Sequence, residues 1–153
     1  MKKCFQFLFG LMLAGLLIKA SEQGKPGDKA TGGRTLKVKL HYTGTGTVDE
    51  KHKIFVVLFD TPDFVKGGAM PLDVQSATEK DATVTFTALQ SSPVYAASSY
   101  DPSGGYDGQS GPPPSGASLG MYSKTPGTPE PINIEAGKTV QVEIAFDDKV
   151  KMP

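Results

Sequence analysis

The stretch Lys53-Ile54-Phe55-Val56-Val57-Leu58-Phe59-Asp60 decides the fold of this chain. Its six central residues are all apolar, most of them are β-branched or aromatic, and a charged residue stands at each end. A short, continuous apolar run of this kind is typical of a strand that is buried on both faces. No other segment after residue 20 is so continuously apolar, so we expect the remaining strands to assemble around residues 53–60.

Six further segments have the pattern of short strands. Apolar and polar residues alternate most clearly in 35–42, which is typical of a half-buried strand. The other five expected strands are residues 72–76, 82–89, 94–100, 131–135 and 139–146. Turns rich in Gly, Pro or charge separate them, and no segment after residue 20 shows the 3.6-residue period of a helix. The sequence therefore predicts an all-β fold, a seven-stranded antiparallel β-sandwich with Greek-key connections.

The N-terminal residues have the pattern of an export signal. Lys2 and Lys3 precede an apolar run at residues 4–18, and Ala20 stands at the −1 position of a cleavage site. This pattern predicts a signal helix over residues 1–20 that is cleaved on secretion, which places the protein in the periplasm or outside the cell. The alternative is a membrane anchor, but the 15 apolar-run residues are fewer than the ~20 that span a bilayer. We therefore expect no membrane insertion after cleavage.

Cleavage after residue 20 changes the composition of the chain. It leaves 133 of the 153 residues, enough for one domain, with 13 basic against 16 acidic residues and a net charge of −3. This charge argues against nucleic acid as a partner. The single cysteine, Cys4, leaves with the signal, which excludes a disulfide or a thiolate site. We expect a flexible linker at 21–34, the sandwich at 35–148 and a tail at 149–153.

A long loop interrupts the pattern of strands. Residues 101–130 hold seven glycines and six prolines. Ordered loops of more than about 12–15 residues are uncommon and tend to be functional or disordered. Within this loop, residues 118–123 are expected to form a short edge strand or to pack over an open end of the sandwich. The alternative is that residues 104–116 are mobile and have no role.

Candidate metal chemistry is confined to the start of this loop. Asp101 and Asp107 supply carboxylates at positions 1 and 7 of a calcium-loop-like pattern, whereas position 3 is only a serine and position 5 a glycine. Asp101 and Asp107 are therefore weak metal candidates, and turn-forming aspartate is the favoured interpretation. We expect no cofactor, with calcium as the alternative. The two histidines lack ligand spacing, and no G-x-S-x-G motif is present.

Three residues of the long loop are the candidate binding residues: Tyr106, Asp107 and Tyr122. Tyrosine offers a rigid ring with a polar tip, on which a sugar or a partner protein can pack, although both rings could equally cover the core. If strand directions alternate, the connections after the first, third, fifth and seventh strands share one pole. That pole would gather residues 43–52, 77–81, 101–130 and 147–148, and we expect a ligand to contact it.

The segments Val56–Phe64, Thr83–Leu89 and Tyr95–Asp101 resemble those of uncharacterised bacterial exported β-sandwich proteins. These are akin to transthyretin-like and carboxypeptidase-regulatory-like domains, and the similarity covers residues 35–148. It implies an immunoglobulin-like or transthyretin-like sandwich. Where such families often carry D-x-N-x-N-G, residues 101–106 read Asp-Pro-Ser-Gly-Gly-Tyr, and the Tyr-Arg-Gly-Ser end of the transthyretin-like hydrolases is absent.

The expected function is that of an exported, non-enzymatic binding or accessory module, with an envelope protein or a carbohydrate as partner. The alternative is a small secreted hydrolase or a metal-dependent enzyme. Serine hydrolysis needs Ser, His and Asp side chains brought together in space, which only the fold decides.

Overall fold

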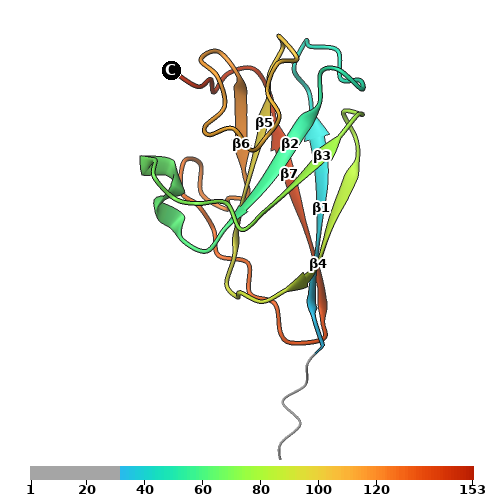
Figure 1. Ribbon diagram of the computed structural model, residues 1–153, viewed down its shortest axis with the longest axis vertical. Coiled ribbons are helices and arrows are strands. Elements are labelled where there is room, and N and C mark those ends of the chain that lie inside the picture. The colour runs from blue at the N-terminus through green and yellow to red at the C-terminus, as the bar shows by residue number, and fades with distance from the viewer. Residues whose placement is uncertain (1–31) are drawn as a thin grey trace, which may run out of the picture.

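The computed structural model describes residues 32–153, which form two β-sheets packed against each other around one apolar core (Figure 1). The signal peptide predicted at 1–20 and most of the linker predicted at 21–34 lie outside the described residues. Among residues 32–153, no helix has the length and apolar character needed to span a bilayer. The prediction of an all-β sandwich is confirmed.

Sheet A has three strands in the order β4-β1-β7, and sheet B has four in the order β3-β2-β5-β6. The strands of sheet A are β1 (Arg34–Tyr42), β4 (Thr83–Leu89) and β7 (Thr139–Phe146). Those of sheet B are β2 (Ile54–Phe59), β3 (Asp73–Ala77), β5 (Tyr95–Tyr100) and β6 (Ser118–Met121). A short 3-10 helix, η1 (Pro62–Lys66), lies between β2 and β3. Strand β1 begins at Arg34, the last residue of the predicted linker.

Two details of the expected topology are wrong. Residues 131–135 do not form a strand: Ile132 makes only an isolated bridge to Val94, and the Ile134 amide donates to the Ser92 side chain rather than to a neighbouring strand. The alternation of Ile132 and Ile134 reflects their burial in the core, not a ladder. The sixth strand is instead β6, which lies inside the segment predicted to be a long loop. An edge strand is one of the two arrangements that the sequence predicts for residues 118–123.

The sandwich is also not fully antiparallel. Strand β1 runs parallel to β7, from the pair Thr35 and Thr139 to the pair Tyr42 and Phe146, and antiparallel to β4. Seven strands that alternate in direction leave the first and the last pointing the same way. Because sheet A places these two side by side, they can pair only in parallel.

Strand β2 is buried on both faces, as predicted. Ile54, Val56 and Leu58 have no exposed surface and point into the core, where they meet side chains of β1 and β7. Burial of one such side chain stabilises the fold by about 1.5–3 kcal/mol before entropic costs. The alternate residues Phe55 and Val57 point to the outer face of sheet B, and both are nearly buried there too. Something other than sheet A must therefore cover that outer face.

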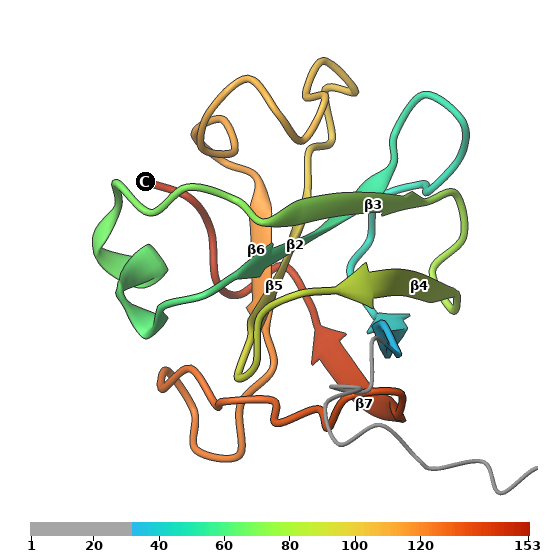
Figure 2. The same ribbon diagram turned by 60° about the horizontal axis from the view of Figure 1, so that its bottom comes forward.

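The connections divide between two poles. Residues 43–53, 78–82, 101–117 and 147–153 lie at one end of the sandwich, the first pole, as the alternation of strand directions predicted. Strand β6 splits the expected 30-residue loop into two connections. Residues 101–117 stay at the first pole, and residues 122–138 lie at the opposite one, as Figures 1 and 2 show from two directions.

Asp148 ties the first pole together. Its Oδ1 accepts hydrogen bonds from the Tyr42 hydroxyl and the Ser118 hydroxyl, both at 2.6 Å, and its Oδ2 accepts one from the Thr45 amide at 2.8 Å. These bonds hold the pKa of Asp148 well below its usual range. Burial, together with the bond to Asp148, raises the pKa of Tyr42 to about 12. The three donors come from β1, β6 and the β1–β2 connection, so one carboxylate links both sheets and a loop.

The predicted tail at 149–153 is held against the edge of sheet B. The Leu119 amide donates to the Val150 carbonyl at 2.9 Å, and the Met152 amide donates to the Ala117 carbonyl at 2.8 Å. Residues 150–152 thereby occupy the outer edge of β6, whose backbone groups would otherwise be open to pairing with another chain.

Candidate contact surface on sheet B

The β5–β6 connection, residues 101–117, is built on the carboxylate of Asp101. This nearly buried group accepts hydrogen bonds from the amides of Ser103, Gly105 and Tyr106 at 2.8 to 3.1 Å, and from the Ser103 hydroxyl. Burial alone would raise the pKa of Asp101, but the hydrogen bonds from this loop outweigh it and lower the pKa. Asp101 therefore organises the start of the loop by itself, as turn-forming aspartates do.

Asp107 performs the same task one turn later. Its Oδ1 accepts hydrogen bonds from the amides of Gln109 and Ser110, both at 2.8 Å, and its Oδ2 accepts one from the Ser110 hydroxyl. These bonds, that from the Ser110 hydroxyl first, lower the pKa of Asp107 to about 2. Asp101 and Asp107 thus serve separate turns. In the described part of the chain, no group of three or more His, Cys, Asp or Glu side chains is placed to hold a metal ion.

Tyr106 fixes the loop onto the outer face of sheet B. Its ring meets Phe55 of β2 edge to face, with ring centroids 5.3 Å apart and an interplanar angle of 75°. Its hydroxyl donates to the Gly111 carbonyl at 2.9 Å. At Gly108 the loop approaches so closely that an added Cβ would lie 2.5 Å from the Phe55 ring. The loop is therefore the cover that keeps Phe55 nearly buried.

Tyr122 lies elsewhere. It follows β6 at the opposite pole, where its amide donates to the Ala96 carbonyl at 2.9 Å and its half-buried side chain packs against the core. The expectation that Tyr106 and Tyr122 share one pole is wrong, because β6 carries the chain from one pole to the other between them. Of the three candidate binding residues, only Tyr106 and Asp107 are brought together.

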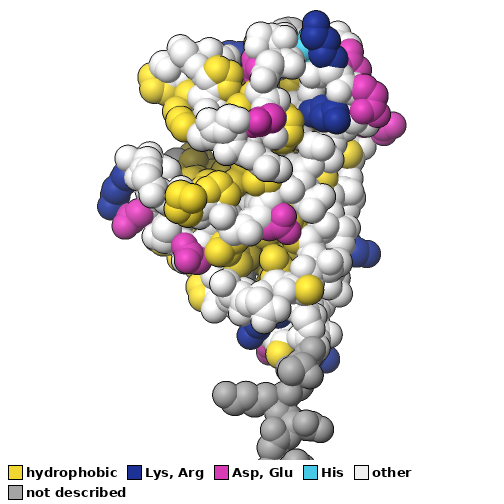
Figure 3. All heavy atoms as spheres, viewed as in Figure 1, with side chains coloured by type: hydrophobic (Ala, Val, Ile, Leu, Met, Phe, Trp, Pro, Cys, Tyr) yellow, Lys and Arg dark blue, Asp and Glu magenta, His cyan; other side chains and the backbone are white. Residues whose placement is uncertain are grey.

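The structure adds a surface that sequence reasoning missed. The β2–β3 connection exposes large apolar side chains: Met70 is 80% exposed, Val65 49% and Leu72 41%. Beside them, the rings of Phe59 and Phe64 stack in parallel at 4.6 Å. We call this surface the sheet-B patch; it consists of Phe59, Phe64, Val65, Met70, Leu72 and Val74. Figure 3 shows hydrophobic side chains gathered on this side of the molecule, in a hollow below the loops of the first pole.

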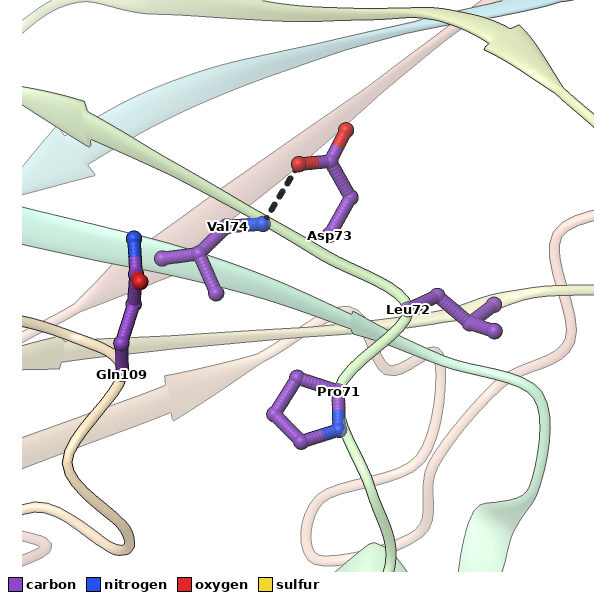
Figure 4. Close-up of a pocket in the computed structure, with 5 residues that line it drawn as sticks. All are labelled: Pro71, Leu72, Asp73, Val74 and Gln109. Carbon is purple, nitrogen blue, oxygen red and sulfur yellow. Dashed lines mark hydrogen bonds between the residues drawn. The ribbon is translucent and has the colours of Figure 1, made fainter.

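A shallow pocket joins the sheet-B patch to the β5–β6 connection. It has a volume of about 330 Å³ and is lined by Pro71, Leu72, Asp73 and Val74 at the start of β3, with Gln109 opposite (Figure 4). The Asp73 Oδ1 accepts a hydrogen bond from the Val74 amide at 2.8 Å. A second hollow, of about 290 Å³, lies within the connection beside Asp101 and Tyr106. Contact groups of both segments therefore converge at the first of these pockets.

The charge around the sheet-B patch is negative. Lys66 of η1 is paired with Asp63, with 2.8 Å between its Nζ and the Asp63 Oδ1. Within residues 32–153, no ion pair involves Asp60, Asp73 or Asp107, which flank the patch in the chain or across the pocket. The Asp73 carboxylate points away from the patch, because Asp73 pairs with the inward-facing Leu58 while Val74 pairs with the outward-facing Val57.

No family model, no curated protein and no solved structure matches this chain. What the surface does must be argued from its own chemistry.

One pairing of a nucleophile with a base lies outside the sheet-B patch. The Lys151 Nζ donates to the Ser118 Oγ at 2.9 Å, and a lysine beside a serine can activate it for attack. Ser118, however, has no exposed surface, and its hydroxyl proton is committed to Asp148. The pair therefore belongs to the hydrogen bonds that close the first pole, since no substrate carbonyl reaches a fully buried oxygen.

Proposed function

We propose that this chain is an exported, non-enzymatic β-sandwich that acts as a binding or accessory module in the periplasm or outside the cell. Its contact surface is the sheet-B patch together with the β5–β6 connection, and its partner is an envelope protein or a carbohydrate. The observation that carries the proposal is the exposure of Met70 and Leu72 beside the pocket at Asp73. Contiguous exposed apolar surface rimmed by polar groups is typical of a site of interaction.

The placement of the surface supports the same conclusion. The patch is carried by a connection that begins and ends in the rigid sheet B, and the loop beside it is held by Asp101, Asp107 and Tyr106. Loops positioned by a rigid scaffold are where binding residues concentrate. The proposal includes the finer classification of the fold, a Greek-key sandwich of immunoglobulin-like or transthyretin-like kind. The strand orders are β4-β1-β7 in sheet A and β3-β2-β5-β6 in sheet B, so the chain crosses from one sheet to the other, which supports this classification.

A capture experiment with matched variants tests this function. The mature chain, immobilised, is exposed to envelope extract, and the retained proteins and glycans are quantified for wild type, for Met70→Ser/Leu72→Ser and for Val150→Ser. Val150 is 60% exposed but lies on the tail, away from the β2–β3 connection, so it controls for loss of an exposed apolar side chain. We expect wild type and Val150→Ser to retain the same partner and the double variant to lose it. Equal retention by all three would contradict the proposal.

Export has its own test. N-terminal sequencing of the secreted protein should give Ser21 as its first residue. A secreted protein that begins at Met1 would show that residues 1–20 are not a cleaved signal.

A further inference from the structure

We propose that this chain forms a symmetric dimer in which the free edge of β7 pairs with the β7 edge of a second copy, so that the two copies of sheet A become one continuous sheet. This dimer goes beyond the proposed function, because β7 lies in sheet A and the sheet-B patch lies on the other sheet. It is supported by the unpaired backbone groups of β7, by the protection of the other three sheet edges and by the side chains that the pairing brings together.

Strand β7 turns a row of unpaired backbone groups outward. It is the last strand of sheet A and pairs only with β1. The Lys138 carbonyl, just before β7, accepts a hydrogen bond from the Thr35 amide at 3.0 Å. The Phe146 carbonyl, at the end of β7, accepts one from the Thr43 amide, also at 3.0 Å, so the even-numbered residues face β1. Because successive residues direct their backbone groups to opposite sides of a strand, the residues that face away from β1 are Thr139, Gln141, Glu143 and Ala145. No hydrogen bond within residues 32–153 satisfies their N–H and C=O groups.

The three other sheet edges are protected. Residues 150–152 cover β6. Strand β3 has only five residues, and the Asp73 carboxylate accepts the Val74 amide at this edge. Strand β4 contains a β-bulge, in which Ala88 has a φ of 56° and its carbonyl accepts a hydrogen bond from the Gln90 side chain. Covering segments, short edge strands, charges and bulges are the means by which proteins prevent unwanted edge pairing.

Strand β7 has none of these protections. It is eight residues long, it pairs with β1 without a register shift, and it contains neither proline nor lysine. A long, regular edge strand with alternating apolar side chains is a template for pairing with another chain. The protection of the other three edges makes β7 the edge at which such pairing is expected.

A second copy fits this edge best in one register. A two-fold axis pairs the strands antiparallel, and odd-numbered residues must pair with one another because the free backbone groups belong to them. An axis at Val142 uses every outward-facing backbone group of both strands. Thr139 then pairs with Ala145 of the second copy, and Gln141 pairs with Glu143. An axis at Gln141 or at Glu143 leaves groups at the strand ends unpaired, and at Glu143 it also places two carboxylates directly opposite each other, which disfavours pairing.

The charges on the outer face suit this register. The Glu143 carboxylate lies 3.2 Å from the Lys39 Nζ of its own chain and would meet Gln141 of the second copy, whose side-chain amide can donate to it. Lys37 is the neighbour of Gln141 in β1, in the same way that Lys39 is the neighbour of Glu143. Each carboxylate of β7 therefore has amide and basic groups around it, and no like charges face each other across the two-fold axis.

The inner face of β7 gains apolar contact. Val140 is only half-buried, whereas Val142, Ile144 and Phe146 are buried. In the register with the axis at Val142, Val140 lies opposite Ile144 of the second copy. Pairing therefore removes the remaining exposed surface of Val140 from water, which favours association.

Sedimentation equilibrium of the mature chain between micromolar and millimolar concentration tests whether the dimer forms, and amide hydrogen exchange locates the contact. An interface of one strand pair is small, so we expect a reversible equilibrium between monomer and dimer in this range. The amides of Gln141, Glu143 and Ala145 should exchange more slowly as the protein concentration rises. The exchange of the amides at residues 70–74, in the sheet-B patch, should not change with concentration.

Substitutions at Gln141 test the edge and the register. Gln141→Pro removes an N–H that β1 does not use, so this variant should fold and remain monomeric. Gln141→Glu sets like charges opposite each other at two symmetric places and should raise the dissociation constant of the dimer by about two- to thirtyfold. Adding Glu143→Gln to that variant exchanges the amide and the carboxylate within the pair, so it should restore the dissociation constant of wild type. Thr85→Glu adds a carboxylate to the outer face of β4 and should dimerise like wild type.

The outcomes separate this dimer from other contacts. A wild-type chain that stays monomeric up to millimolar concentration would overturn the proposal, and slower exchange of the β7 amides only in envelope extract would then identify a strand of another protein as the occupant. A dimer that Gln141→Pro leaves intact would exclude the β7 edge, and one that Met70→Ser/Leu72→Ser abolishes would place the contact on the sheet-B patch. A dimer weakened by Gln141→Glu but not restored by Glu143→Gln would refute the register. If Gln141→Pro fails to fold, Gln141→Glu and its combination with Glu143→Gln still decide the question.

Discussion

Replacing Asp148 with alanine should open the first pole of the sandwich. The substitution removes the acceptor of the Tyr42 and Ser118 hydroxyl groups, both of which are nearly or fully buried. A buried polar group left without a partner costs about 1–3 kcal/mol, so the two together would cost about 2–6 kcal/mol. Because 29% of the Asp148 side chain is exposed, water can enter the gap, and we expect the lower part of that range, about 2–4 kcal/mol.

Asp147 supplies a matched control for this substitution. It is the neighbouring residue and also a carboxylate, but it accepts only from the amide and Nζ of Lys149, and Lys149 is well exposed. Exposed ion pairs of this kind contribute about 0–1 kcal/mol. Urea unfolding followed by circular dichroism should therefore show a much lower free energy of unfolding for Asp148→Ala than for Asp147→Ala. Equal values for the two variants would refute the assignment of Asp148 as the link between the sheets.

The dependence on pH follows from the two shifted groups. Since hydrogen bonds from Ser118, Tyr42 and Thr45 lower the pKa of Asp148, its contribution is present above the unfolded value of about 3.9 and is lost as pH falls through the folded value. The difference between wild type and Asp148→Ala should therefore shrink in acid. The pKa of Tyr42 is raised to about 12, so its contribution is complete below pH ~10 and is lost as pH rises from there. A difference between the variants that did not change below pH 4 would contradict the role of the Asp148 charge.

Three further pairs of variants test the core, a close contact and the tail. Val56→Asp should prevent folding, because it buries a carboxylate at a position with no exposed surface. Val57→Asp, on the outer face of sheet B, should cost less and still melt cooperatively. If Val56→Asp also melted cooperatively, at the same temperature as Val57→Asp, the two faces would be misassigned. Gly46→Ala should lower the free energy of unfolding by about 1–3 kcal/mol, since its Cβ would lie 2.3 Å from the Tyr100 ring. Gly105→Ala, whose Cβ would make only ordinary contacts, should unfold like wild type. Deletion of residues 149–153 exposes the edge of β6 and should therefore produce larger species than wild type on size-exclusion chromatography. Lys151→Ala keeps the backbone hydrogen bonds of the tail and should elute like wild type.

The sequence predicts most of the fold because alternation along a strand depends on local burial. The apolar run at 53–60 indicates a strand buried on both faces, and β2 is one; alternation at 35–42 likewise identifies β1. Alternation fails where a segment lies against the core without a neighbouring strand, as residues 131–135 do. It also fails for β6, because Ser118–Met121 is short and contains Gly120, which packs where a Cβ would meet Phe146.

The candidate site was only partly predictable, for a related reason. Tyr106 and Asp107 stand out because aromatic and charged residues are unusual in a loop rich in Gly and Pro. The sheet-B patch does not stand out, because Met70 and Leu72 follow Gly67 and Gly68 in what reads as a turn. Their exposure depends on η1 and on the packing of Phe64 over Phe59, which are tertiary features. A signal was present in the unusual number of apolar residues in that connection, at Phe64, Val65, Met70 and Leu72.

Photo-crosslinking tests the claim that the sheet-B patch is a contact surface most directly. A benzoylphenylalanine is placed at Leu72 in one variant and at Thr85, on the outer face of sheet A, in another, and each is irradiated in envelope extract. The account predicts a discrete polypeptide adduct at Leu72 that unlabelled wild type suppresses and unlabelled Met70→Ser/Leu72→Ser does not. Adducts formed equally at Thr85, or adducts at Leu72 that both competitors suppress to the same degree, would contradict it.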